Sequence, residues 1–206
     1  MKKIFDLDSP VIRLLGRLTD LMVLNIIFLA ACLPVITIGA AWTALYYVTL
    51  KMVRNEEAYI ASSYWKAFRE NFRQATVIWG GVLCMLIVLV LDFRMMGAVG
   101  NDGLRPLQML LISAGVLFSM LVSYVFPLLA RFQNTIPKML RNAMLIAVRH
   151  LPSSIAVLAV MAGSVFVTFL NSTTVVYGIP FWALFGFAAI AYAKSWFFRK
   201  VFEKYE

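Results

Sequence analysis

Long apolar runs alternate with short polar segments along this chain of 206 residues. An α-helix rises about 1.5 Å per residue and the hydrocarbon core of a bilayer is about 30 Å thick, so roughly 20 apolar residues make one crossing. Four runs near or above this length contain no Asp, Glu, Lys or Arg: residues 21–50, 74–91, 106–130 and 151–193. The pattern predicts an all-α, polytopic membrane protein with one integral membrane domain over residues 1–206.

The first run is too long for one upright helix, and the Leu33-Pro34 pair interrupts it, with Gly39 shortly after. Proline lacks a backbone N–H and disfavours helix in the residue before it, so we expect a break at Pro34, assisted by Gly39. The first run then forms two helices instead of one. The expected spans are 14–33, 36–53, 74–96, 106–130, 152–170 and 175–197, and five spans are the alternative if the first run crosses once.

The positions of Lys and Arg favour six spans over five, because cytoplasmic segments of membrane proteins carry the excess of cations. With five spans, the 19 cations divide 13 to 6 between the two sides. With six, 17 lie on one side and only Arg94 and Arg105 on the other. We therefore expect a multi-pass membrane protein with both termini in the cytoplasm.

Composition narrows the classes of function. A hydrophobic content of 62% and a mean hydropathy of +0.84 exclude a water-soluble core. The net charge of +9 lies beside the apolar runs rather than on a separate basic module, which favours anionic lipid headgroups over nucleic acid. His150 is the only histidine, and the sequence has no CxxC motif and no phosphate-binding glycine loop. We expect no enzyme, no metal and no cofactor.

Two cytoplasmic segments have the spacing of amphipathic helices. One follows the second span, and its apolar face recurs at intervals of three and four residues: Ile60, Tyr64, Trp65, Phe68 and Phe72. The other follows the fourth span. The aromatic face of the first helix suits either a partner or lipid at the membrane interface, or packing against the ends of neighbouring helices. Both interpretations stay open on the sequence.

A few polar residues in or near the spans are candidates for function. Arg13, Arg17, Asp20 and Asn25 fall along one helical stripe, which fits a polar track for a solute or an ion pair that anchors the first span. Pro127 is expected to break the fourth span, and a broken helix exposes carbonyl groups that can line a cavity.

Several short motifs resemble the YesL-like family of bacterial integral membrane proteins, which is domain of unknown function 624. They are Phe5-Asp6-Leu7-Asp8-Ser9-Pro10, Leu33-Pro34-Val35-Ile36-Thr37-Ile38-Gly39, Ala44-Leu45-Tyr46-Tyr47, Arg54-Asn55-Glu56-Glu57 and Phe68-Arg69-Glu70-Asn71-Phe72-Arg73-Gln74. The similarity is dense over about residues 4–80. Asn55 stands where the family pattern has an acidic residue. The resemblance implies a Gram-positive-type plasma membrane protein encoded beside carbohydrate ABC importers and their sensors.

Two hypotheses on function follow. The first is a non-enzymatic accessory or regulatory protein of a carbohydrate uptake or sensing system, with ABC importer or sensor components as partners of the aromatic helix. The second is a small transporter that moves a solute through the helix bundle.

Overall fold

The computed structural model describes residues 10–56, 59–99 and 105–202, and this part of the chain is helical and contains no strand. The all-α prediction is therefore confirmed. In chain order the elements are α1 (Pro10–Cys32), the 3-10 turn η1 (Val35–Thr37), α2 (Ile38–Val53), α3 (Ile60–Val99), α4 (Arg105–Arg131), α5 (Ile136–Arg149), α6 (Leu151–Thr168), α7 (Ser172–Phe181), the π-helical segment η3 (Trp182–Gly186) and α8 (Phe187–Phe202).

Six helical segments of the described chain are long and apolar enough to cross a membrane. They are Leu14–Cys32, Val35–Val53, Ile60–Met95, Leu107–Arg131, Leu151–Thr168 and Ser172–Phe202. The first apolar run divides where α1 ends at Cys32 and η1 begins at Val35, so the break at Pro34 is present. Six helices long and apolar enough to cross a membrane are therefore confirmed in the described chain, and the first apolar run forms two of them.

Two of the expected helix breaks are absent. Gly39 lies in the first turn of α2, where its missing side chain allows α2 to approach α3, and it does not interrupt the helix. Pro127 lies inside α4, which continues to Arg131. A proline removes one hydrogen bond, and the buried neighbours Phe126 and Leu128 hold α4 in place around it.

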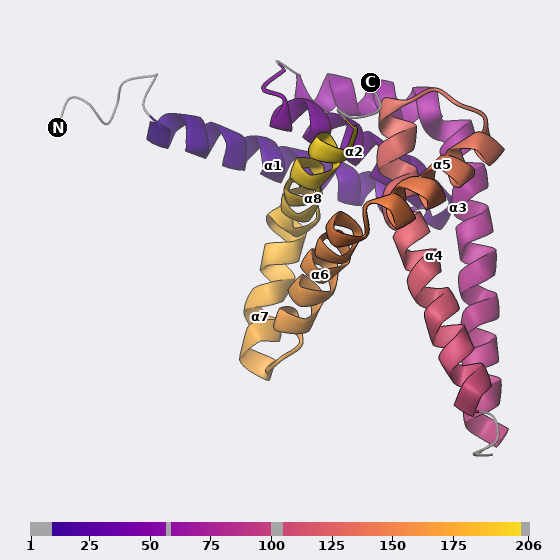
Figure 1. Ribbon diagram of the computed structural model, residues 1–206. Coiled ribbons are helices and arrows are strands. Elements are labelled where there is room, and N and C mark those ends of the chain that lie inside the picture. The colour runs from indigo at the N-terminus through magenta and orange to yellow at the C-terminus, as the bar shows by residue number, and fades with distance from the viewer. Residues whose placement is uncertain (1–9, 57–58, 100–104, 203–206) are drawn as a thin grey trace.

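The aromatic helix expected over 60–72 and the span expected over 74–96 form one continuous helix, α3, of 40 residues. Its first turns lie across the upper end of the molecule in Figure 1, and the rest runs down beside α4. α2 packs against both parts of this bent helix. The Tyr64 hydroxyl donates to the Ala41 carbonyl at 3.4 Å, and a Cβ atom added to Gly39 would lie 2.7 Å from the Ala75 carbonyl oxygen.

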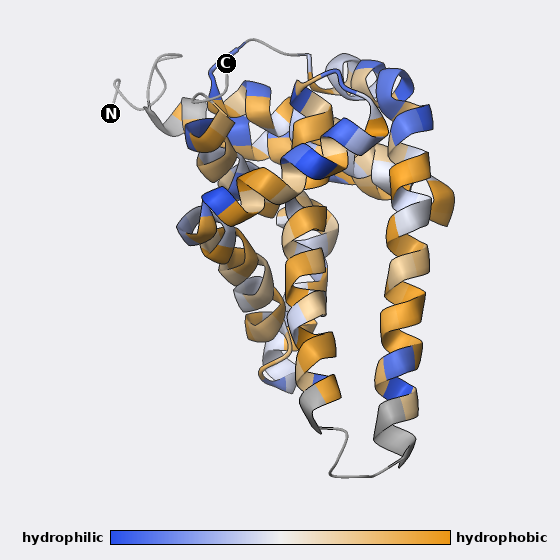
Figure 2. Cartoon of the chain, turned by 45° about the vertical axis from the view of Figure 1, so that its right-hand side comes forward, coloured by the Kyte–Doolittle hydropathy of each residue, from blue (hydrophilic) through white to orange (hydrophobic). Residues whose placement is uncertain are grey.

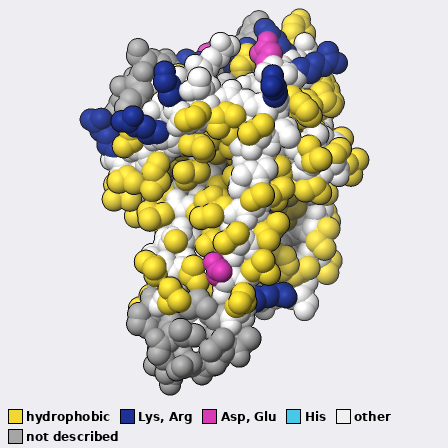
Figure 3. Space-filling model, turned by 90° about the vertical axis from the view of Figure 1, so that its right-hand side faces the viewer, with side chains coloured by type: hydrophobic (Ala, Val, Ile, Leu, Met, Phe, Trp, Pro, Cys, Tyr) yellow, Lys and Arg dark blue, Asp and Glu magenta, His cyan; other side chains and the backbone are white. Residues whose placement is uncertain are grey.

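The helices form two groups by direction. The long part of α3, α4, α6 and the continuous run from α7 to α8 extend downward in Figures 1 and 2, whereas α1 and α5 lie across their upper parts. Hydrophobic side chains cover the middle of the face in Figure 3, between a cationic upper end and a few charges near the lower end. The charge pattern matches a membrane protein whose cations gather on one side.

Aromatic side chains fill the core where α2, α4 and α8 meet. The ring of Phe198 lies 5.7 Å from Tyr46, 5.2 Å from Tyr124 and 5.7 Å from Phe202, measured between centroids, and all four residues are buried. A hydrogen bond of 2.9 Å joins the Thr49 and Ser195 hydroxyls nearby. This core fixes α8 against α2 and α4.

Candidate functional site

The residues predicted to form a polar track on α1 do not make one continuous row of polar side chains. Arg17 donates to the Asn55 side-chain oxygen at 2.6 Å and to the Tyr192 hydroxyl at 3.3 Å, so it links α1 to the end of α2 and to α8. Within the described residues no ion pair joins Arg17 to Asp20. The side chain of Arg13 lies outside the described part of the structure.

Asn55 is the partner that positions Arg17. Its φ angle of 56° lies in the left-handed region, which asparagine tolerates better than most residues, and it ends the turn after α2. An acidic residue at this position would place a carboxylate against the Arg17 guanidinium. In this chain a neutral amide takes that place.

Asn25 is fully buried and binds the π-helical segment instead of facing a solute path. Its side-chain nitrogen donates to the carbonyls of Trp182 at 3.1 Å and Ala183 at 2.8 Å, and its oxygen accepts from the Ala188 N–H at 3.1 Å. A π-helical turn shifts the backbone hydrogen-bond register, and such turns often mark functional sites. The Asn25 amide pairs these groups in an apolar setting, a contact that the sequence pattern did not predict.

The aromatic face of α3 is divided between packing and exposure. Tyr64 is buried, and Ile60 and Phe68 pack against the core, as the packing interpretation expects. Trp65 and Phe72 remain 41% and 39% exposed. The rings of Trp65 and Phe68 lie 5.4 Å apart, so the exposed indole is braced by a packed neighbour. Trp65 and Phe72 are therefore the members of this set that reach the surface.

Cations surround the exposed aromatic residues of α3. Lys66 and Arg69 are exposed and, with Ser62, Trp65 and Glu70, line a surface hollow of about 610 Å³. We call the exposed set of Trp65, Lys66, Arg69 and Phe72 the α3 platform. This surface suits a partner segment that carries an apolar side chain flanked by acidic residues. Tryptophan and arginine are enriched where protein interfaces gain most of their binding energy.

Further cations lie where α2, α4 and α8 end. The Lys51 ammonium lies 5.0 Å from the Tyr47 ring centroid, Arg54 pairs with Glu56 at 3.7 Å, and Arg199 donates to the Val53 carbonyl at 3.1 Å. Positive side chains near helix C-termini offset the partial negative charge of the unpaired carbonyls. Of these contacts, the hydrogen bond from Arg199 to Val53 joins the ends of α8 and α2.

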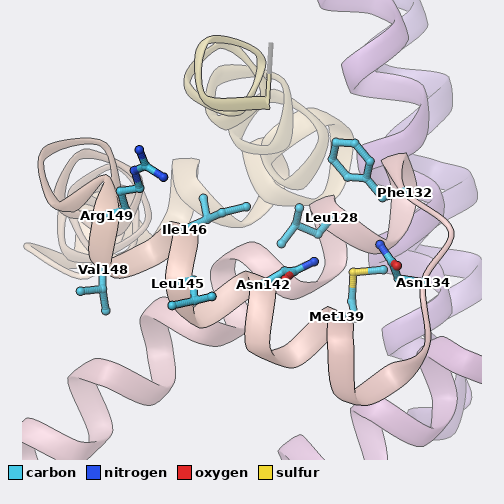
Figure 4. Close-up of a pocket in the computed structure, with 9 residues that line it drawn as sticks. All are labelled: Leu128, Phe132, Asn134, Met139, Asn142, Leu145, Ile146, Val148 and Arg149. Atoms are coloured by element: carbon cyan, nitrogen blue, oxygen red, sulfur yellow. The ribbon is translucent and has the colours of Figure 1, made fainter. Parts of the chain in front are cut away.

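A groove between the end of α4 and α5 was missed by the sequence reasoning. Figure 4 shows its lining, and its volume is about 560 Å³. The lining residues are Leu128, Phe132, Asn134, Met139, Asn142, Leu145, Ile146, Val148 and Arg149. The amphipathic pattern of α5 was visible in the sequence, but the groove also needs the end of α4, which lies beside α5 only in the folded chain.

Lys194 was counted among the cytoplasmic cations, yet the structure buries it inside α8. The side chain is 3% exposed, and its amino nitrogen lies 3.5 Å from the sulfur of Met161 on α6. A thioether is a weak acceptor for an ammonium group that carries three donors. Ionisable groups in membrane helices are costly and often serve function, so Lys194 joins the candidate residues.

The described residues contain no group of three or more His, Cys, Asp or Glu side chains that could hold a metal ion. The candidate features of the described residues are the α3 platform, the α4–α5 groove and the buried Lys194 amine.

Comparison with known proteins finds a family match in the first part of the chain. Residues 21–93 match the model of a family described as a protein of unknown function, DUF624. This segment is similar to the DUF624 family. The resemblance predicted from the sequence motifs is thereby confirmed over α2, most of α3 and the part of α1 from Leu21 onward. No curated protein and no solved structure matches the chain.

The candidate features fall on both sides of the DUF624 boundary. Asn25, Pro34 and the α3 platform lie inside the matched segment, whereas Lys194 and the α4–α5 groove lie after it. The platform is thus the candidate surface that belongs to the family segment.

Proposed function

We propose that this protein is a non-enzymatic accessory or regulatory membrane protein of a bacterial carbohydrate uptake or sensing system, and that it holds a partner at its cytoplasmic face. One observation carries the proposal: Trp65 and Phe72 are exposed beside cations on the α3 platform, at the cationic end of the helices. A component of an ABC importer or its sensor, with an apolar side chain flanked by acidic residues, fits this surface.

The orientation follows from the charges. In this proposal the protein lies in the plasma membrane with both termini in the cytoplasm, and the platform faces the same compartment, where the excess of Lys and Arg is expected. The cationic end also contacts anionic lipid headgroups.

Affinity capture from a mild detergent tests the partner. The tagged protein should enrich an importer or sensor component, and the Trp65→Ala/Phe72→Ala double variant should lose it. A Leu86→Ala/Val90→Ala variant is the matched control, because these residues are exposed on the apolar part of the same helix. An unchanged partner list in the platform variant, or no importer or sensor component in any sample, refutes the proposal.

The second candidate, a small transporter, is supported by the buried Lys194 amine. Liposomes that contain the purified protein should then move a solute, with flux lost in Lys194→Met and kept in Lys200→Met, a change at an exposed lysine on the same helix. Absence of flux across a broad solute panel, or equal flux in the two variants, refutes this role for Lys194.

A further inference from the structure

The depth of the α1–α2 hairpin is set by a contact with α3. At the hairpin tip, the Val35 carbonyl accepts a hydrogen bond of 2.8 Å from the Trp79 indole, and Gly39 abuts the backbone of Ala75. Trp79 lies six residues after Arg73 and fifteen before Arg94. At 1.5 Å per residue, the tip is about 9 Å along α3 from the cationic end and about 22 Å from the opposite charged end.

The rest of the hairpin agrees with this shallow depth. α2 starts at the level of Trp79 and ends at Val53, whose carbonyl accepts from Arg199 near the cationic end. α1 lies across the direction of α3 and α4 in Figure 1 rather than beside them along their length. Both arms therefore begin and end within the part of the molecule nearer the cations, and between its ends α1 contacts Trp182 and Ala183 through Asn25.

The tip has the chemistry of a segment that meets hydrocarbon. Leu33, Val35 and Ile36 are 83%, 59% and 65% exposed, and no charged residue lies between positions 21 and 50. The turn between α6 and α7 is polar by contrast, with Asn171 and Thr174 forming a capping box. The α6–α7 turn also carries no charge, so the contrast lies in its four consecutive polar residues from Asn171 to Thr174, where the tip has only Thr37.

Several backbone groups at the tip are paired, which a lipid environment favours. The Thr37 hydroxyl lies 2.6 Å from both the Ala31 and Pro34 carbonyls, and the Thr37 N–H donates to Pro34 at 3.0 Å. Leu33 donates to the Ala30 carbonyl, and Trp79 pairs with Val35 as described above. Pro34 itself has no N–H to satisfy.

The distribution of Lys and Arg does not distinguish a hairpin that crosses the membrane from one that enters only one leaflet. Because residues 21–50 hold no cation, moving the tip from one side of the bilayer to the other leaves the same 17 of 19 Lys and Arg residues together. The packing against α3 supplies the information that the charges lack.

From this geometry we infer that α1 and α2 form a re-entrant hairpin that enters and leaves the membrane on the cationic side. Its apolar surface, from Leu14 through the tip at Ile36, contacts the hydrocarbon of that one leaflet. α3, α4, α6 and the run from α7 to α8 make the crossings.

Distance measurements between spin labels test the depth directly. In a background without Cys32 and Cys84, Ile36→Cys is paired with Val77→Cys or with Phe93→Cys; all three native residues are exposed. Val77 and Phe93 lie on one helix, separated by about 24 Å at 1.5 Å per residue. The re-entrant hairpin gives the shorter distance for the 36/77 pair. A shorter distance for the 36/93 pair overturns the inference.

Thiol labelling tests the membrane consequence. Single cysteines replace Ile36 at the tip, Thr173 in the α6–α7 turn and Ser62 at the start of α3, the last two being exposed controls. An impermeant maleimide should label Thr173→Cys and Ser62→Cys from opposite sides of the membrane. Ile36→Cys should stay at background from the Thr173 side, and labelling there at the Thr173→Cys rate contradicts the inference. Loss of a soluble partner from the α3 platform would leave both results unchanged.

Discussion

Replacing Asn25 by leucine should lower the stability of the protein sharply, although the change makes α1 more apolar. Leucine has the same number of side-chain heavy atoms and the same branching at Cγ, but it removes two hydrogen bonds from α1 to the π-helical segment and one to Ala188 of α8. The polar groups of Trp182, Ala183 and Ala188 then lose the partner that α1 supplies.

The expected loss of stability follows from these three hydrogen bonds. Hydrogen bonds between membrane helices contribute about 0.6 kcal/mol each on average, so three give about 2 kcal/mol. A buried backbone N–H left without a partner, here that of Ala188, adds about 1–2 kcal/mol. We expect Asn25→Leu to reduce the free energy of unfolding by about 3 kcal/mol. Asn25→Asp should destabilise at least as much, because a carboxylate oxygen would face the carbonyls of Trp182 and Ala183.

Reversible unfolding in mixed micelles of a mild detergent and sodium dodecyl sulfate, followed by circular dichroism, measures the effect. Val23→Ala is the control on the same helix, because Val23 is 41% exposed and its truncation should change stability by less than about 0.5 kcal/mol. Hydrogen exchange at residues 182–188 should increase in Asn25→Leu. If Asn25→Leu unfolds at the same denaturant fraction as Val23→Ala, the role given to the Asn25 amide is wrong.

Three further changes test other contacts by the same unfolding assay. Gly39→Ala should destabilise the protein by about 1–3 kcal/mol, because the added Cβ would lie 2.6 Å from the Trp79 Cβ. Gly80→Ala is the control and should be neutral, because no atom lies within 4 Å of its added Cβ. Equal effects of the two variants would contradict the close approach of α2 to α3. Trp79→Phe removes the hydrogen bond to the hairpin tip and should cost about 1 kcal/mol, detectable as a lower unfolding midpoint. Lys194→Met places an apolar side chain where a buried amine now lies, so stability should hold or rise, and a loss above about 1 kcal/mol would show that the amine has a stronger partner than Met161.

The sequence could place the helices because hydropathy and proline act locally. The charge-free runs gave the apolar segments, and Pro34 divides α1 from α2 as its missing donor requires. The same local rules failed at Gly39 and Pro127, where packing against α3 and the core keeps each helix continuous. The same rules predicted separate helices over 60–72 and 74–96, which form the continuous α3. A change in amphipathic character does not by itself end a helix.

The candidate residues were harder to place because their roles depend on contacts distant in sequence. Asn25 was visible as a polar residue in an apolar run, but its partners lie 157 to 163 residues further along the chain. Lys194 could be counted as a flanking cation, because only the packing of α8 on α6 buries it. For the aromatic helix, periodicity grouped five residues on one face, and packing decided that Trp65 and Phe72 stay exposed.

The sequence by itself determined that this chain belongs in a membrane, which residues form its helices, and that most of its cations share one end. The tertiary structure alone decided which helices run along the common direction, how deep the α1–α2 hairpin reaches, and which polar side chains are paired. The physical reason is that hydropathy reports how strongly a segment avoids water. Lipid and protein interior are alike in this respect, so only the contacts between helices, such as Trp79 with Val35, tell the two apart.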